Sequence, residues 1–208
     1  MTGVEPLLRE QWSRLRAWVE SERVLEHAAE PSGLGAWTVG DLVVHLGYGL
    51  RMVAEVTAAT DVEPISLAGY VAGYSPARGR IATDTVALAA SLRGRELAGI
   101  DAMAAEAWRA LDGGLPPVVL GRRGPLRRDD FLSTRLVELV THGDDLHCGF
   151  GPGRPSPLLP AAVDLVAAVL ADGYQAATGR PARWGGVELI RVATGRTTTD
   201  DPAMPLLS

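Results

Sequence analysis

Three side chains have types and spacings that suit metal chemistry. His45 and His142 lie in segments with helical spacing on otherwise apolar faces, and Glu138 precedes His142 by four residues. Successive helical residues are about 100° apart, so Glu138 and His142 stand one turn apart on the same stripe and can bind one object. A facing helix that adds His45 would complete a His/His/Glu set, which catalytic zinc sites use when they keep one coordination position open. A second interpretation needs no metal, because a half-buried Glu138 and His142 can satisfy each other.

The other residues that carry chemistry favour an open metal site over alternative centres. The one cysteine, Cys148, is too few for the Cys-rich patterns of structural zinc sites, and we expect it to be a small buried hydrophobic residue rather than a nucleophile. The sequence has no His-Glu-x-x-His motif and no paired Glu-x-x-His units of the di-iron type. His147 lies about 140° around the helix from His142, which makes it a poor partner for the same metal.

Two polar residues on the Glu138 stripe are candidates for a supporting role. Asp145, three residues after His142, either holds this histidine from behind or is a polar residue at the end of the helix. Arg135 lies one turn before Glu138, and we expect a salt bridge between them.

The composition is that of a folded protein without a nucleic-acid or membrane footprint. Of the 208 residues, 47% are hydrophobic and 22% are charged, which is close to the ordinary globular mixture. The formal net charge is −5 and no long run of one sign occurs, so we expect small-molecule partners rather than nucleic acid or a membrane. No apolar run reaches the ~18 residues that span a bilayer, and the N-terminal residues lack the features of a signal peptide. We therefore expect a cytoplasmic protein, and the sequence leaves its oligomeric state open.

Long stretches with helical spacing, separated by Gly and Pro, indicate an all-α fold. The expected helices cover residues 5–29, 38–60, 83–111, 128–148 (starting near Pro125 or Arg128) and 158–178. Thr38 and Asp41 have the spacing of a capping box, which explains Asp41 without a function. Residues 61–82 are rich in Gly and Pro and are expected to be an irregular connection. Residues 187–192 suit a short strand or a short helix equally.

Four long helices joined in this way predict a four-helix bundle with a short C-terminal extension. We assign residues 1–153 to the bundle and residues 154–208 to the extension, which consists of a fifth helix and an irregular or short-strand tail packed on the bundle.

Three segments carry a resemblance to a known family. These are WTVGDLVVHL at 37–46, RLVELVTHGDDL at 135–146 and ATGR at 193–196. In order and spacing, they resemble the maleylpyruvate isomerase family of mycothiol-dependent enzymes, within the DinB-like superfamily. The resemblance implies a DinB-like four-helix bundle with a divalent metal, most simply zinc, at His45, Glu138 and His142. It also implies a low-molecular-weight thiol, mycothiol, as cosubstrate, which the metal binds and activates as thiolate.

One departure from the family concerns the C-terminal part. The isomerases of the family carry a fuller C-terminal domain, whereas about 50 residues follow Pro157 here, too few for that domain in full. We expect these residues to be a truncated counterpart of it. Within them, Arg191 or Arg196 either holds a substrate carboxylate, for which arginine is well suited, or is a solvated surface residue.

The sequence thus predicts a metal-dependent thiol transferase or isomerase that acts on a small electrophile. Asp145 and Arg191 are its candidate catalytic residues, beside the metal ligands His45, Glu138 and His142. Two alternatives stay open: a non-catalytic metal- or ligand-binding bundle, and a metal-dependent hydrolase that uses bound water.

Overall fold

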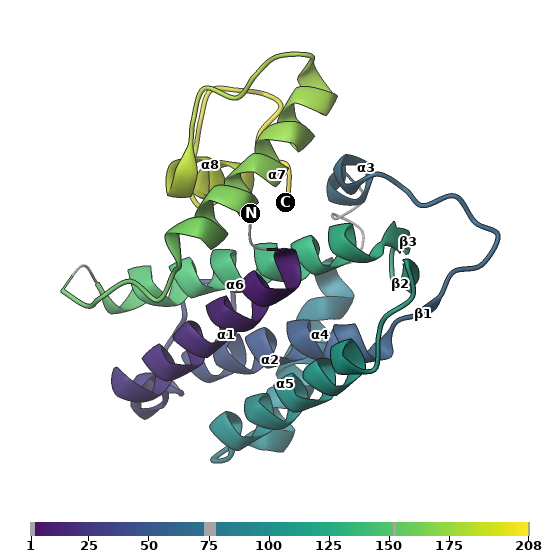
Figure 1. Ribbon diagram of the computed structural model, residues 1–208. Coiled ribbons are helices and arrows are strands. Elements are labelled where there is room, and N and C mark those ends of the chain that lie inside the picture. The colour runs from purple at the N-terminus through teal and green to yellow at the C-terminus, as the bar shows by residue number, and fades with distance from the viewer. Residues whose placement is uncertain (1–2, 73–77, 152, 208) are drawn as a thin grey trace.

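The computed structural model describes residues 3–72, 78–151 and 153–207, and its helices form the predicted DinB-like bundle (Figure 1). The four bundle helices are α1 (Val4–Ser21), α2 (Val39–Glu55), α5 (Glu96–Asp112) and α6 (Arg128–Phe150). Helix α1 packs on α6, α6 packs on α2, and α2 packs on α5. Ion pairs from Arg9 to Asp112, at 2.7 Å, and from Arg16 to Asp101, at 2.9 Å, join α1 to α5 and close the ring.

The core lies between these four helices, and its apolar positions follow the helical period. In α1, Leu8, Trp12, Leu15 and Val19 follow one another at steps of four, three and four residues, and all four are buried. The largest fully buried side chains of the bundle helices are Leu8, Leu15, Leu42, Leu46, Leu50, Ile100, Leu132, Leu136, Leu139 and Leu146. Burial of this apolar face drives the association of the helices.

The start of α2 confirms the predicted cap. The Thr38 backbone N–H donates to Asp41 Oδ2 at 2.8 Å, and the Asp41 N–H donates to Thr38 Oγ1 at 3.1 Å. The predicted helix over 38–60 is too long, because the chain becomes extended at Val56 and pairs as β1 (Thr57–Ala58).

Two predicted helices are interrupted in the structure. The first ends at Ser21 instead of residue 29, because Arg23 adopts a left-handed conformation (φ 57°) before a short 3-10 helix, η1 (Val24–His27). The predicted helix over 83–111 is two helices, α4 (Arg78–Leu92) and α5, separated at Gly94, whose φ is +76°. Glycine adopts this conformation without steric cost, and a single glycine within an Ala/Leu-rich stretch gave no clear signal of a break.

The connection over 61–82 is more regular than expected. It contains α3 (Leu67–Ala72) and the first residues of α4, while residues 73–77 lie outside the described residues. A small antiparallel sheet in the order β1-β2-β3 lies at one end of the bundle, with β2 (Val118–Gly121) and β3 (Gly124–Arg127) forming a hairpin directly before α6. From the sequence, Pro116 and Pro117 predict only an extended link before α6.

The C-terminal extension packs on α6, on the opposite side from α2 and α5 (Figure 1). It consists of α7 (Pro160–Thr178), close to the predicted 158–178, and α8 (Gly186–Ala193). Residues 187–192 are therefore helical, and the short-strand alternative is wrong. The helix α8 and the turn after it place Arg191 and Arg196 near the C-terminal half of α6.

Candidate metal centre

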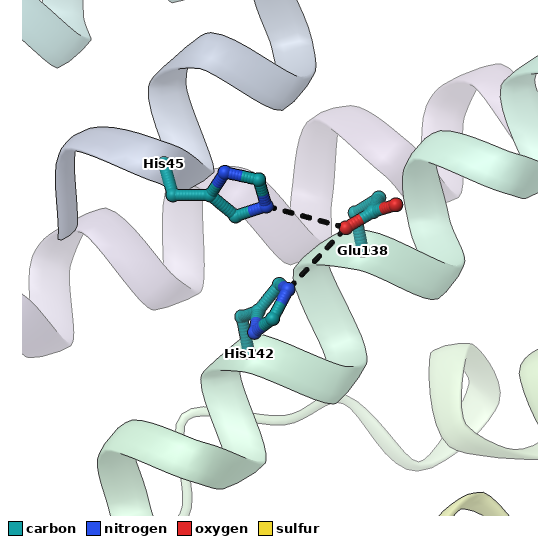
Figure 2. A group of neighbouring side chains, drawn as sticks. All are labelled: His45, Glu138 and His142. Carbon is teal, nitrogen blue, oxygen red and sulfur yellow. Dashed lines mark ion pairs between the residues drawn. The ribbon is translucent and has the colours of Figure 1, made fainter. Parts of the chain in front are cut away.

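The structure brings His45, Glu138 and His142 together between α2 and α6 (Figure 2). The Nε2 atoms of His45 and His142 lie 3.5 Å and 3.4 Å from the same carboxylate oxygen, Oε2 of Glu138. One ligand atom from each residue lies within 4.8 Å of the others. The two histidines are almost fully buried, and the Glu138 side chain is 15% exposed.

These distances can be tested against the geometry of a bound ion. Zinc-to-ligand bonds of about 2.0–2.1 Å at tetrahedral angles place two ligand atoms roughly 3.4 Å apart. A charge-assisted hydrogen bond between a nitrogen and a carboxylate oxygen is shorter, at about 2.7–2.9 Å. The two contacts at 3.5 and 3.4 Å are longer than such a hydrogen bond and close to the spacing of two ligands on one cation, while the set of three ligand atoms as a whole lies within 4.8 Å. Two imidazoles and a carboxylate are also a donor set that zinc accepts.

Both imidazole rings are fixed through their other nitrogen. Nδ1 of His45 lies 3.0 Å from Oγ1 of Thr85, a fully buried residue of α4. Nδ1 of His142 lies 2.9 Å from Oδ2 of Asp145, one turn along α6. In zinc sites, an acceptor at Nδ1 holds the proton there and leaves the Nε2 lone pair for the metal, and both contacts are placed to do so.

The electrostatics of the site keep His45 neutral and Glu138 anionic, whereas they raise the pKa of His142. Burial lowers the pKa of His45 below its ordinary value, so this ring is neutral. Burial alone would raise the pKa of Glu138, but the two imidazoles outweigh it and hold this pKa well below the ordinary value. The pKa of His142 is raised, because Asp145 and Glu138 together outweigh the opposing effect of burial. An anionic oxygen thus lies next to two imidazole nitrogens, and a cation that displaced the proton favoured on His142 would meet all three.

The predicted catalytic residue Asp145 lies directly behind His142. Its second partner is Arg196, whose Nε and Nη2 donate to the two carboxylate oxygens at 2.9 and 2.7 Å. Burial would raise the pKa of Asp145, but His142 and Arg196 outweigh it and lower this pKa to about 2. The sequence left open whether Asp145 holds His142 or is only a polar residue at the end of the helix, and in the structure it contacts His142.

Arg191, the other predicted catalytic residue, forms a two-point ion pair next to the one between Arg196 and Asp145. Its Nε and Nη2 donate to Asp144 at 2.7 and 2.8 Å, and Nη2 also lies 3.1 Å from the Sγ atom of Cys148. The side chain is 38% exposed and borders the cavity described below. Its guanidinium is therefore bonded to Asp144 rather than directed at the three candidate ligands.

Two expectations about neighbouring residues are wrong. Cys148 is exposed, not buried, because it lies near the end of α6 at the edge of the cavity, and partial burial together with Asp144 raises its pKa. Among the described residues, Arg135 forms no ion pair with Glu138; its guanidinium instead donates to Gly49 O at 3.4 Å and to the Tyr70 hydroxyl at 3.3 Å. His147 lies apart from the candidate ligands, with Nε2 3.0 Å from Arg154 O.

The candidate ligands line an open cavity of about 1420 Å³. Its walls are one face of α4, the loop over residues 32–37, the C-terminal half of α6 and the segment over residues 191–197. The centroids of the Trp37 and His45 rings lie 4.8 Å apart, and the rings are tilted by 48°. Thr141, on the Glu138 stripe, also lines the cavity, and its buried hydroxyl has no hydrogen-bond partner within the described part of the chain. No sequence pattern singled out Thr85 or Thr141.

The fold and the residue cluster define a DinB-like helical bundle with a candidate His/His/Glu metal centre. The chain belongs to the family of the mycothiol maleylpyruvate isomerase N-terminal domain, whose model matches residues 8–147. This range contains all three candidate ligands and ends before the C-terminal extension. No curated protein and no solved structure matches the chain. Within the described residues, none of the helices combines the length and the apolar character needed to cross a bilayer.

Proposed function

We propose that this protein is a metal-dependent enzyme that activates a low-molecular-weight thiol, of the mycothiol type, for attack on a small electrophile. His45, Glu138 and His142 hold the metal, most simply zinc, and leave one coordination position facing the cavity. The observation that carries this proposal is the convergence of two Nε2 atoms on one oxygen of Glu138 at 3.5 and 3.4 Å. Membership of a family named for mycothiol supports the choice of a thiol as the cosubstrate.

The chemistry of such a site follows from its donors. A divalent ion bound there would supply a Lewis acid, at which a thiol loses its proton near neutral pH. Thr85 and Asp145 keep the two imidazoles oriented. The cavity of about 1420 Å³ exceeds the roughly 300–1,000 Å³ of a typical ligand pocket, so it has room for a thiol and an electrophile together.

The reaction type remains a choice between two outcomes of one attack. When the thiolate sulfur bonds to a carbon of an activated alkene, rotation and expulsion of the same thiolate give the cis–trans isomer with the thiol regenerated. When the sulfur instead displaces a leaving group, the product is a thioether conjugate and the leaving group departs with its electron pair. Proximity of the two reactants in one cavity accelerates either reaction.

Metal content tests the ligand assignment first. Purified, untagged protein should contain about one equivalent of zinc or another divalent ion, and His45→Ala and His142→Ala should contain little after gentle chelation. His147→Ala is the matched control, because His147 lies on the same helix but outside the cluster, and it should keep the parent's metal content. Unchanged metal in His142→Ala, or none in reconstituted parent protein, would contradict the assignment.

Thiol dependence then separates the candidate functions. Turnover of model electrophiles only when mycothiol is added supports the proposal. Turnover without any thiol would identify a hydrolase that uses bound water, and its absence under every condition would favour a binding protein. Binding of mycothiol to the cobalt-substituted protein, seen as a new sulfur-to-cobalt absorption band, checks thiol coordination without any turnover.

A further inference from the structure

The cavity over the candidate metal centre has two unlike walls. One is a face of α4 on which Thr83 is the one polar residue of the described lining; its apolar residues, which we call the α4 wall, are Ile81, Ala82, Val86, Ala87 and Ala90. The other is formed by α6 and the segment over residues 191–197, and it carries Asp144, Asp145, Arg191 and Arg196.

The α4 wall is apolar surface that the protein itself does not cover. Ala82, Val86 and Ala90 are spaced by four residues and so form a continuous stripe along the helix. Val86 is 46% exposed, and it is the one exposed large hydrophobic residue that the described cavity lining contains. A ligand with an apolar body would bury this stripe and gain hydrophobic free energy.

The charges on the opposite wall are matched within the protein. Each cavity-lining arginine in the described residues forms a two-point fork, Arg191 with Asp144 and Arg196 with Asp145. The two aspartate side chains are only 7% and 6% exposed, so a ligand carboxylate that displaced either one would leave a buried charge without its partner. This wall therefore disfavours an anionic ligand.

A separate observation points to a polar but uncharged group on the ligand. Thr141 lines the cavity and is 6% exposed, and its buried hydroxyl has no hydrogen-bond partner among the described residues. An orphaned buried hydroxyl is costly, and threonine in a helix has two accessible χ1 rotamers. A change of rotamer would let this hydroxyl donate to a carbonyl oxygen of a bound ligand.

We propose that the electrophile is an uncharged, carbonyl-activated molecule whose apolar body packs on the α4 wall. This inference rests on the proposed function, because it assigns the substrate class of the same site. It excludes small dicarboxylate-like electrophiles and makes Val86 a specificity-determining residue.

The test uses unreactive ligands so that binding is measured apart from chemistry. N-alkylsuccinimides from ethyl to hexyl resemble thiol-reactive N-alkylmaleimides but lack the double bond, and 6-succinimidohexanoate adds a terminal carboxylate to the hexyl chain. Calorimetric titration of the metal-loaded protein should show affinity rising by up to about fourfold per methylene. The carboxylate should bind at least about tenfold more weakly than the hexyl compound. Equal affinities along the series, no binding of any member, or tighter binding of the carboxylate would overturn the proposal.

Substitutions at two similarly exposed valines localise the effect. Val86→Asp should weaken binding of the hexyl compound about tenfold or more, whereas Val62→Asp, which changes a 54% exposed valine outside the cavity lining, should not. Val86→Arg should reverse the preference and favour 6-succinimidohexanoate. A loss of folding cannot produce such a reversal, so this variant separates a specificity role from a structural one. An unchanged preference in Val86→Arg would refute the assignment of Val86.

The same titrations distinguish failure of this inference from failure of the proposed function. In His142→Ala, the alkyl series should keep its slope, because the α4 wall does not depend on the metal, while cobalt-monitored thiol binding should be lost. An alkyl series that binds as expected without any thiol coordination in the parent would reject the thiol function but leave the apolar subsite. Thiol coordination with a flat alkyl series would reject the subsite alone.

Discussion

The hydroxyl of Thr85 should control how tightly the protein holds its metal. Thr85 is fully buried in α4, and its Oγ1 atom lies 3.0 Å from Nδ1 of His45. When Nε2 of His45 binds a metal, Nδ1 must carry the proton, and Thr85 Oγ1 is the acceptor placed to receive it. Thr85→Val keeps nearly the same shape but removes this acceptor.

The size of the effect follows from burial. His45 is 4% exposed, so water does not replace the lost acceptor. A buried N–H without a partner costs about 1–3 kcal/mol, which corresponds to a roughly five- to 150-fold change in a binding constant. Without metal, the imidazole can move its proton to Nε2 and donate toward Glu138, so most of the cost falls on the loaded state. We expect zinc affinity to fall by about 10- to 100-fold, the range typical of groups that orient metal ligands.

Competition for zinc against a chromophoric chelator at constant pH measures this change. Thr85→Ser retains the hydroxyl and should restore an affinity close to that of the parent. Ser91→Ala, which removes an exposed hydroxyl further along α4, should have no effect. The reasoning would be refuted by a folded Thr85→Val protein that binds zinc within twofold of the parent. It would also fail if Thr85→Ser were as weak as Thr85→Val.

Three further outcomes test the packing and charges of the fold. Gly47→Ala should lower the free energy of unfolding, measured by chemical denaturation, by about 1–3 kcal/mol, because the added methyl group would lie 2.8–2.9 Å from atoms of α5. Gly49→Ala on the same helix is the control: its methyl group would meet nothing nearer than 3.9 Å, so this variant should be neutral or stabilising. Equal effects would contradict the close approach of α2 and α5. The Tyr174 hydroxyl donates to Asp201 at 2.6 Å and lowers the pKa of this carboxyl below its ordinary 3.8. The ionised Asp201 therefore stabilises the fold above pH 3.8, and this stabilisation is lost as the pH falls through the lowered pKa. Thermal unfolding of Asp201→Asn should lack this acid-dependent loss. Arg191→Met should lower the melting temperature, because its aspartate partner is buried, but leave the metal content unchanged, and a loss of metal would instead place Arg191 in the metal centre.

The sequence predicted those parts of the site that depend on local geometry. The four-residue step from Glu138 to His142 places both on one stripe of any regular helix, and α6 is such a helix over the whole region. The capping box at Thr38 is likewise a local property, and it fixes where α2 begins and so the rotation of His45. The contact between His45 and this stripe depends on how α2 packs on α6. The residues alone left this packing open, and the expectation came from the family resemblance.

The parts that could not be predicted depend on tertiary contacts. The break at Gly94 divides a continuous Ala/Leu-rich pattern, and only the packing of α4 beside α2 requires the chain to turn there. This break positions α4, and with it Thr85 beneath His45 and Val86 at the cavity. A threonine and a valine within an alanine-rich helix carry no pattern that distinguishes them from ordinary helical residues. Their roles follow from the neighbours that the fold brings to them.

The ion pairs between the C-terminal extension and α6 also depend on tertiary contacts that the sequence does not reveal. Asp144 and Asp145 are adjacent in the sequence, but their arginine partners follow 47 and 51 residues later, from one short segment around the end of α8. Arg196 binds the same carboxylate that holds His142, so the docking of this segment and the orientation of a candidate ligand depend on one buried group. Lifting the segment would leave Asp145 buried without its cation, and part of that cost would appear as a weaker hold on His142. The extension is therefore coupled energetically to the candidate metal centre, although the family match ends before it.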